Sequence, residues 1–401
     1  MSLLDASITE DADGLLPELI ELRRRIHRHP EIGLELPVTQ ATVLEALSDL
    51  PLEIETGTAL TSVTATLHGT RPGRRVLLRG DMDALVMPED TGLDFSSELP
   101  GVMHACGHDV HVAMLVGAAR LLCARRDELA GSVRFMFQPG EEGQGGAPQM
   151  IAEGVLVGVD AAFAIHITPN IPSGWIATRP GPLMASADEI FITVRGRGGH
   201  ASTPHFTADP VPVACEIVGA FQTAVTRRVD AFAPAVVTIA TIEAGTTTNV
   251  IPETARLAGT IRTTSERTRD LVHADLVRLA EGIAAAHAMT AEVRIDPGYP
   301  VTVNDAATAA LVLDEVGPRV VAERARVVEA PAPTMGAEDW SYVLQKVPGA
   351  MAFLGVCPPD VPDARNAPAC HSNVMRLDEP AMATGVALHT AMALRLLDGP
   401  A

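Results

Sequence analysis

The sequence predicts an α/β fold, a mostly parallel sheet flanked by helices and interrupted by a compact inserted α+β domain. Short apolar runs, such as Val76-Leu77-Leu78 and residues 133–137, alternate with helical segments through the first half, an order typical of parallel sheets. The pattern changes near Met184 and resumes at about Pro297. A chain of 401 residues, 47% of them hydrophobic, is long enough to bury two cores.

The first domain is predicted to begin with a helix over residues 15–29, which ends at Pro30. The basic residues between Arg23 and His29 are interpreted as a solvated helix face, because charge runs usually are one. The other elements expected in this domain are, in chain order, a strand at 62–68, a hairpin turn at 70–74, a strand at 75–78, a helix at 112–119, a strand at 133–137, a helix at 147–153, a strand at 160–165, a helix at 306–316, a strand at 351–354 and a helix at 379–397.

Between residues 186 and 296 the expected elements follow the order β-α-β-β-α-β, which is typical of ferredoxin-like domains. They are expected at 189–195, 210–228, 235–242, 256–263, 265–287 and 291–295. We therefore predict a first domain formed by residues 1–185 and 297–401, with residues 186–296 inserted as the second.

Composition excludes several classes of partner. The chain has 50 acidic and 30 basic residues, for a formal charge of −20, so nucleic acid and anionic membrane surfaces are not expected as partners. We find no apolar run of about twenty residues that spans a bilayer, and residues 1–14 show no signal region. The 5 cysteines lack framework spacing, which suits a reducing cytoplasm.

Three clusters of side chains that ligate metals follow apolar runs or precede a helix. The first contains Asp81 and Asp83, the second Cys106 and His108, and the third the Glu141-Glu142 pair. The first and third clusters directly follow predicted strands, and ligands in α/β folds bind at the carboxyl ends of the strands. We therefore expect the clusters to meet at one edge of the sheet.

A hydrolytic di-metal site needs several ligands from different strands and a carboxylate that moves protons. The candidates are Cys106, His108, Glu142, His166 and His371. Cys-Gly-His spacing is weak evidence alone, and a lone histidine is more often structural than a ligand, so the case rests on the number and placement of the clusters. For the glutamate pair we prefer one ligand beside one general base over two exposed loop residues, because adjacent buried carboxylates repel unless a cation neutralises one.

Several motifs of the sequence together resemble those of one known family. The sequence resembles the metal-dependent amidohydrolase branch of the aminoacylase/carboxypeptidase metallopeptidases, which holds hippurate hydrolase, auxin-amino-acid conjugate hydrolases and N-acetyldiaminopimelate deacetylase. The resemblance covers roughly residues 15–395, and the matching segments are Gly80–Leu85, Met103–Asp109, Gln138–Gly143, Gly196–Ser202, Pro204-His205, Asp209-Pro210, Thr248–Pro252, Gly259–Arg262 and Gly336–Trp340. It implies a di-metal peptidase domain with an inserted ferredoxin-like lid and dimerisation domain.

The resemblance also implies roles for particular residues. Five of them match the family's ligands to two divalent ions per subunit, namely Cys106, His108, Glu142, His166 and His371. Glu141 matches the catalytic glutamate, and Asp83 an aspartate that orients a ligand. His200 matches a histidine that reaches the partner subunit's site in a homodimer, and Asn249 and Arg262 match positions near the substrate, although local turns alone explain these three motifs equally well. Closure of the inserted domain is expected to bring His200 and Arg262 onto the substrate.

The expected reaction is hydrolysis of the amide of a small N-acyl amino acid. The alternatives are a dipeptidase or carboxypeptidase on the same scaffold, and a non-catalytic homologue that only binds a ligand. The acyl group and the amino acid stay open, and manganese, zinc, nickel and cobalt all suit the ligand set. The chain departs from the family at Trp340 and Cys370; these departures bear on pocket shape, and Cys370 is not predicted to be a sixth ligand.

Overall fold

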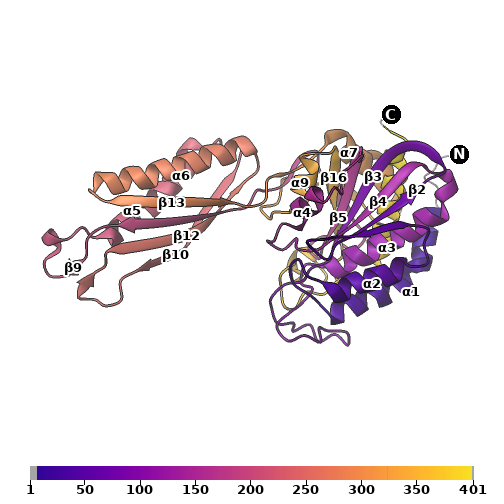
Figure 1. The fold of residues 1–401 in the computed structure, drawn as a ribbon, viewed down its shortest axis with the longest axis horizontal. Helices are drawn as coiled ribbons and strands as arrows, with labels where there is room; N and C mark the ends of the chain where they lie inside the picture. Colours follow the sequence, from indigo (N-terminus) through magenta and orange to yellow (C-terminus); the bar gives the residue numbers. More distant parts are fainter. Residues whose placement is uncertain (1–6, 323, 400–401) are drawn as a thin grey trace. The chain divides into compact units, whose positions relative to one another are not determined.

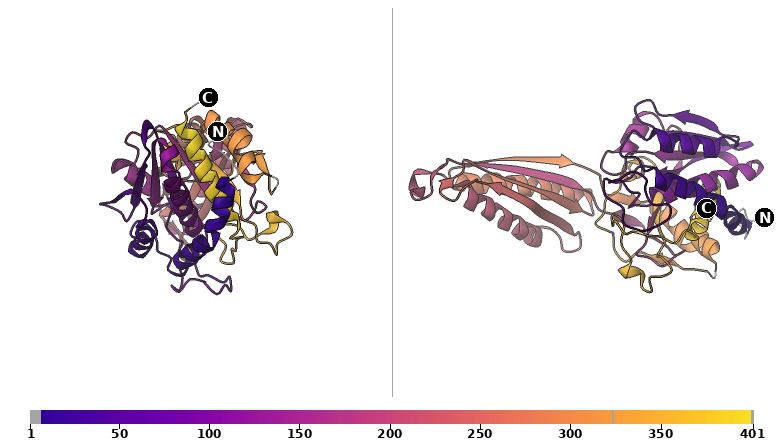
Figure 2. Two further views of the ribbon diagram at one scale, coloured as in Figure 1. Left: turned by 90° about the vertical axis from the view of Figure 1, so that its right-hand side faces the viewer. Right: turned by 90° about the horizontal axis from the view of Figure 1, so that it is seen from below.

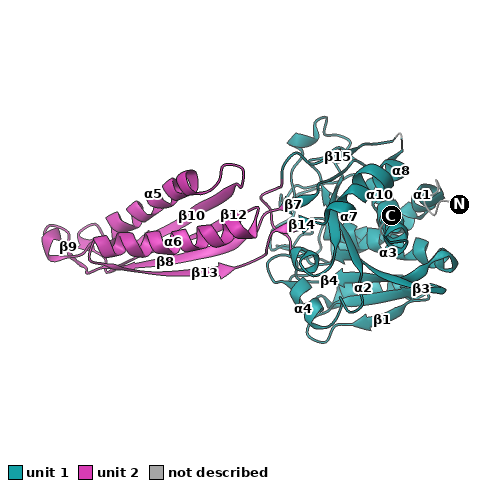
Figure 3. Cartoon of the chain, turned by 90° about the horizontal axis from the view of Figure 1, so that it is seen from above, with its two compact units in different colours: residues 1–183, 303–332, 339–401 teal, residues 184–302, 333–338 magenta. Residues whose placement is uncertain are grey.

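The computed structural model describes residues 7–322 and 324–399; residues 1–6, 323, 400 and 401, all within the predicted first domain, lie outside the described residues. The chain divides into two compact units (Figure 3), unit 1 with residues 1–183, 303–332 and 339–401 and unit 2 with residues 184–302 and 333–338. Unit 2 includes the segment 333–338, which local patterning does not indicate. The segment belongs there because Ala185 N donates to Thr334 O at 3.0 Å.

Unit 1 is built on an eight-stranded sheet with the order β1-β2-β4-β3-β5-β16-β6-β15 (Figure 1). Its strands are β1 (Glu53–Thr56), β2 (Val63–His68), β3 (Arg71–Asp81), β4 (Ala130–Gln138), β5 (Ala161–Thr168), β6 (Ile176–Thr178), β15 (Val327–Glu329) and β16 (Gly349–Gly355). The four central strands, β4, β3, β5 and β16, pair in parallel, whereas β1 pairs with β2 and β2 with β4 antiparallel. The predicted fold class is therefore confirmed, with antiparallel pairings on both sides of the parallel centre, since β6 also pairs antiparallel with β16.

The predicted hairpin at residues 70–74 is wrong, because β4 lies between β2 and β3. Leu67 of β2 and Val76 of β3 both pair with Val133 of β4. Met136 and Phe137 of β4 point to opposite faces of the sheet and are both fully buried, so this strand is covered on both faces. The buried strand β4 therefore takes the position between β2 and β3, although the connection between β2 and β3 is short.

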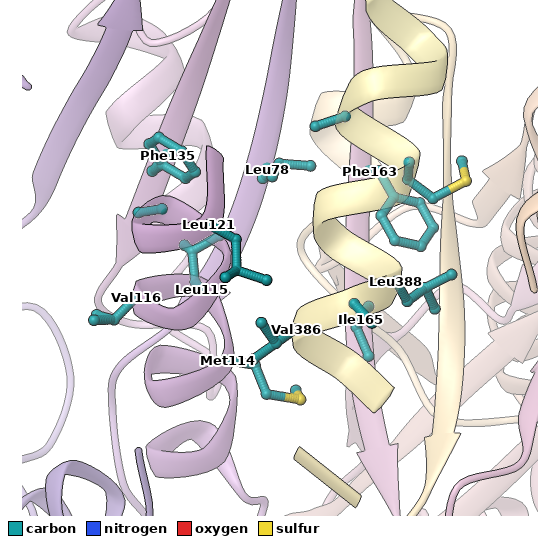
Figure 4. Packing of buried hydrophobic residues seen from close by; sticks show 14 of the residues in the cluster. Leu78, Met114, Leu115, Val116, Leu121, Phe135, Phe163, Ile165, Val386 and Leu388 are labelled. Carbon is teal, nitrogen blue, oxygen red and sulfur yellow. The ribbon is translucent and has the colours of Figure 1, made fainter. Parts of the chain in front are cut away.

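The helices of unit 1 are α1 (Ser7–Arg28), α2 (Pro37–Leu47), α3 (His108–Ala124), η1 (Arg126–Glu128), α4 (Gly146–Ala152), α7 (Ala306–Ala310), η3 (Leu311–Val316), α8 (Gly317–Val321), α9 (Ser341–Leu344), η4 (Ala364–Asn366) and α10 (Ala381–Leu397). The first and last long helices, α1 and α10, run side by side, and both pack on α3 (Figure 2). The three approach closely at Gly117, where a Cβ would lie 2.6 Å from Val386 and 2.8 Å from Leu19. Aliphatic side chains such as Leu115 and Leu388 fill the core between α3, α10 and the sheet (Figure 4).

Unit 2 contains β8 (Asp188–Arg195), α5 (Pro210–Arg228), β10 (Ala235–Ala244), β12 (Thr254–Thr263), α6 (Glu266–Ala286) and β13 (Thr290–Pro297). Its sheet has the antiparallel order β10-β12-β8-β13, which confirms the ferredoxin-like prediction. Both helices begin at capping side chains, since Asp209 accepts from Val211 N at 3.0 Å and Ser265 accepts from Thr268 N at 3.1 Å. A core of its own, with Phe221 fully buried, lies between these helices and the sheet.

Shorter elements complete the fold. These are β7 (Gly181–Met184), β9 (Gly199–His200), η2 (Pro204–Phe206), β11 (Val250–Ile251) and β14 (Thr302–Asn304). Among the described helices, none is long and apolar enough to cross a bilayer.

Candidate metal centre

The five side chains predicted as ligands come from four segments of unit 1. Cys106 lies in the loop before α3, His108 is the first residue of α3, Glu142 follows β4, His166 lies within β5 and His371 lies in the loop before α10. Gly107 between the first two has φ 82°, and a Cβ there would lie 2.5 Å from Ile167 Cγ1. Only glycine therefore permits the turn that directs Cys106 and His108 to one place.

The structure brings these five side chains together. Cys106, His108 and His166 offer ligand atoms within 4.8 Å of one another, and so do Cys106, Glu142 and His371. The Cys106 Sγ lies 3.4 Å from His166 Nε2, and His371 Nε2 lies 3.2 Å from Glu142 Oε1. Because Cys106 belongs to both groups, the arrangement offers two adjoining cation positions that share one sulfur.

Backbone carbonyls select the imidazole tautomer that suits a metal. His108 Nδ1 lies 2.8 Å from the Asp83 carbonyl oxygen, and His166 Nδ1 lies 2.6 Å from that of Ile167. Each Nδ1–H therefore donates, which leaves Nε2 with a free lone pair. The Nε2 atom of His108 is buried without a hydrogen-bond partner among the described residues, as expected of a nitrogen that ligates a cation.

The centre carries an excess of negative charge, which a bound cation would neutralise. Burial opposes protonation of His108, but the carboxylates of Asp81, Asp83 and Glu142 outweigh it and raise its pKa to about 10. Burial by itself would raise the pKa of Glu142. The neighbouring His371 and His108 have the larger combined effect, so the pKa of Glu142 is lowered. The donor set of thiol, imidazole and carboxylate therefore fits divalent transition metals, which Cys and His ligate.

Asp83 orients the segment that carries the glutamate pair. Its Oδ1 accepts from Glu141 N at 3.0 Å and its Oδ2 from Glu142 N at 2.9 Å. Both bonds end on one carboxylate, so the turn after β4 is held in a single conformation. Glu141 is buried, and its carboxylate lies within 4.8 Å of the ligand atoms of His108 and Glu142. The geometry thus places a carboxylate outside the five-residue set but next to it.

The sequence placed Asp81 in the first metal-ligating cluster without a role of its own and did not single out His111; in the structure the two form a second layer behind the centre. His111 Nδ1 donates to Asp81 Oδ1 at 2.5 Å, and His111 Nε2 accepts from Ile167 N at 2.9 Å. The His111 ring stacks on His108 at 5.5 Å and meets His166 edge-on at 4.9 Å. The signal was available, because His108 and His111 are spaced i, i+3 on one helix face.

The interpretation of the basic segment of α1 as a solvated face is wrong for its central residues. The side chains of Arg23 and His27 are 3% and 1% exposed. Arg23 Nε and His27 Nδ1 both lie 2.8 Å from Asp109 Oδ2, and Arg23 Nη1 lies 2.8 Å from Glu379 Oε1. Asp109 directly follows His108, and Glu379 lies shortly after the loop of His371, so α1 joins both ligand-bearing segments.

The three candidate residues of unit 2 separate into two places. Val250 pairs with His200, and Ala201 N donates to Asn249 O at 3.1 Å, so His200 and Asn249 are neighbours in the β9–β11 pair. Both side chains are exposed. Arg262 lies near the other end of β12, opposite Val236 of β10. Figure 1 shows β9, which contains His200, at one end of unit 2.

Comparisons with known proteins identify the family of the chain. The model of Peptidase family M20/M25/M40 matches residues 77–395. Thermostable carboxypeptidase 1 of Saccharolobus solfataricus is 41% identical, over 94% of this chain and 95% of the relative. N-acetyl-L-cysteine deacetylase of Bacillus subtilis is 38% identical, over 88% and 84%. The crystal structure of the Bacillus subtilis YXEP protein, described as a dinuclear metal binding peptidase, superposes with a TM-score of 0.83 at 34% identity, over 96% and 99%. The chain belongs to peptidase family M20/M25/M40, which confirms the resemblance seen in its motifs.

Proposed function

We propose that the protein is a metal-dependent hydrolase that cleaves the amide bond of N-acyl amino acids and releases a carboxylate and a free amino acid. Two divalent ions would be held by Cys106, His108, Glu142, His166 and His371. The observation that carries the proposal is the position of Glu141, a buried carboxylate within 4.8 Å of two of these donor groups. Structural metal sites are closed and need no such neighbour.

Glu141 is the general base and then the general acid in this proposal. Divalent ions, when bound, supply Lewis acidity toward water and toward the scissile carbonyl. Glu141 accepts the proton of the attacking water and donates it to the leaving amine nitrogen, so its carboxylate ends the cycle as it began. Asp83 keeps Glu141 in place through the bond to its backbone N–H, at 3.0 Å.

The relatives support this reaction class and leave two substrate classes. N-acetyl-L-cysteine deacetylase acts, by its name, on an amide between an acyl group and an amino acid, and a carboxypeptidase on the last amide of a peptide. In both substrates an amino acid with a free carboxylate leaves as the amine. The second candidate function is therefore a carboxypeptidase, favoured by the 41% identity to thermostable carboxypeptidase 1.

The test is a panel of N-acetyl, N-benzoyl and peptidyl forms of the same amino acids, assayed on chelator-treated protein to which manganese, zinc, nickel or cobalt is returned. Release of amino acid that depends on metal and on an N-acyl substrate supports the proposal. A preference for peptides would support the carboxypeptidase, and no turnover by protein that holds two metals per chain would contradict both. The sulfur of Cys106, which belongs to both groups of candidate ligands, favours zinc, cobalt or nickel over manganese.

We further propose a homodimer in which His200 serves the partner subunit's site. Support comes from the geometry of unit 2: His200 lies beyond the Thr254 end of β12, and the run from Thr254 to Arg262 corresponds to about 27 Å of extended strand. One small substrate cannot contact both His200 and Arg262 of a single unit 2. We therefore replace the expected closure of one lid over the substrate by a division of roles, in which His200 and Arg262 of one chain serve different sites. Arg262 would bind the substrate carboxylate.

Mixing two inactive variants tests this division. In a dimer of Glu141→Ala and His200→Ala chains, one site keeps its own Glu141 and receives an intact His200 from the partner. Random mixing should then restore about a quarter of wild-type activity, since half of the dimers would each hold one complete site. Activity that stays at the level of the separate variants would contradict a role in trans.

We also propose a cytoplasmic location, because free thiols at the centre suit a reducing compartment.

A further inference from the structure

Cys370, one of the departures from the family, lies against the candidate ligand Cys106. Cys370 packs against the small buried cluster of Met103, Ala105 and Met375, in which Ala105 adjoins Cys106 in the sequence. The Cys370 Sγ is also 4.0 Å from the carbonyl oxygen of Cys106 and 3.9 Å from that of Ile167. His371 N donates to Ala105 O at 2.7 Å, so the two loops run side by side at these cysteines.

The two thiols differ in access. Cys106 is 7% exposed, whereas Cys370 is half-buried and lies next to His371, whose side chain is 55% exposed. A small oxidant therefore reaches Cys370 before it reaches Cys106. All five cysteines are free, and the other three lie elsewhere: Cys123 on α3, Cys215 exposed on α5, and Cys357 after β16 with its Sγ 3.6 Å from Pro358 O.

We propose that Cys106 and Cys370 form an oxidation site, at which a peroxide closes a disulfide that removes Cys106 from the metal donor set. Cys106 is the donor common to both groups of candidate ligands, so its loss weakens both cation positions at once. The oxidant is a small hydroperoxide, because Cys370 is only partly exposed and the reaction needs no more than a two-electron oxidant.

The chemistry balances in two steps. The Cys370 sulfur attacks one oxygen of hydrogen peroxide; the O–O bond breaks, and Cys370 becomes a sulfenic acid while one water leaves. The Cys106 sulfur then attacks the Cys370 sulfur, the S–O bond breaks, and the hydroxyl leaves with a thiol proton as a second water. The two thiols lose two electrons and two protons in total, and one peroxide becomes two waters. A dithiol reductant reverses the change and returns Cys106 as a ligand.

The experiment uses the full metal-loaded chain, treated with increasing hydrogen peroxide. Released metal is followed with a chromogenic chelator, and disulfides are mapped by mass spectrometry of peptides prepared without reduction. Wild-type protein should give a Cys106–Cys370 cross-linked peptide in proportion to the metal released, and dithiothreitol followed by metal should restore full occupancy. Cys370→Ala should release metal about tenfold more slowly and without recovery by dithiothreitol, because Cys106 then oxidises only to its own oxyacids.

Cys215→Ala is the matched control, since it removes an exposed thiol from unit 2 and should behave as the wild type. Equal rates of metal release from wild type and Cys370→Ala would overturn the proposal, and so would metal loss without the cross-linked peptide. Protein that keeps both thiols and its metal in millimolar peroxide would overturn it as well. These readouts use no substrate, so their failure is distinct from failure of the proposed hydrolase.

Discussion

The candidate residues of unit 1 and those of unit 2 are held in opposite ways. Around Glu141, side chains on or next to β3, β4, β5 and α3 converge, and His108, His111, His166 and Asp83 each form a hydrogen bond with a backbone group. At the tip of unit 2, His200 and Asn249 are exposed on a pair of two-residue strands. The centre of unit 1 is preorganised by its own chain, whereas the tip of unit 2 is not.

This difference indicates where the chemistry is completed. Ligands that must hold cations at fixed distances need a rigid surrounding, and unit 1 supplies it through the Arg23 and His111 contacts. A residue that only has to approach the substrate can lie on an exposed tip and gain its environment from another surface.

Replacing Glu141 tests whether the centre of unit 1 contains the proton carrier. Glu141→Ala should lower kcat by about 10³-fold or more, because a positioned general base and acid contributes on that scale, while the metal content stays that of the wild type. Steady-state kinetics with an N-acyl amino acid and metal analysis of the same sample measure the two quantities. Glu142→Ala is the contrast, since it should lose metal as well as activity. A kcat within tenfold of wild type would show that the base is elsewhere.

Replacing Arg23 tests the rigid surrounding. Arg23→Gln leaves the buried carboxylate of Asp109 and that of Glu379 without their shared partner, and breaking a buried pair in this way costs about 3–5 kcal/mol in free energy of unfolding. Metal affinity should fall in parallel, because Asp109 adjoins His108. Urea unfolding and competition with a chelator measure the two effects. Arg25→Gln, whose pair with Glu45 is exposed, should cost less than about 1 kcal/mol; an equal cost for both variants would contradict the network.

The buried His389 of α10 should make unit 1 sensitive to mild acid. Burial, helped by His111, lowers the pKa of His389 to about 3, so the folded state stays unprotonated where the unfolded state, with a pKa of about 6.5, binds a proton. Its contribution to stability is therefore complete above pH 6.5 and is lost as pH falls toward 3, with about 2 kcal/mol lost between pH 7 and 5.

His389→Gln removes the titrating group and should reduce that loss. Urea unfolding of the wild type and of His389→Gln measures the free energy of unfolding at pH 7 and at pH 5. The loss between the two pH values is then compared between the two proteins. His287, which lies on the surface of unit 2 with its side chain 45% exposed, provides the matched control: His287→Gln should leave the acid sensitivity of the wild type. The assignment would fail if His389→Gln lost stability between the two pH values as steeply as the wild type.

The smallest effect is expected for surface charges of unit 2. Arg195 on β8 and Glu292 on β13 form a cross-strand pair at 3.1 Å, with side chains 57% and 73% exposed. Arg195→Gln should change the free energy of unfolding by less than about 1 kcal/mol, because water and salt screen such pairs. Thermal unfolding at low and high salt measures it. A cost comparable to that of Arg23→Gln would remove the contrast between the two units.

Much of the fold was predictable where local pattern and tertiary role agree. The elements of unit 2 were expected almost to the residue, for example the helix at 210–228, which begins where the Asp209 side chain caps it. The hairpin at residues 70–74 was not, because β4 pairs with both β2 and β3. Strand order depends on contacts between distant segments, and a turn signal says nothing about them.

The same division holds at the site. The sequence by itself determined which residues converge, since thiol, imidazole and carboxylate at strand ends, with Gly107 between two of them, suit little except a metal. Only the tertiary structure decided that Arg23 and His27 face inward, that the His111 ring contacts those of His108 and His166, and that the Cys370 Sγ lies 4.0 Å from the Cys106 carbonyl oxygen. A charge, a ring or a thiol has the same local signature whether it is buried or solvated, because burial is set by the helices and loops packed against it and not by its neighbours in sequence.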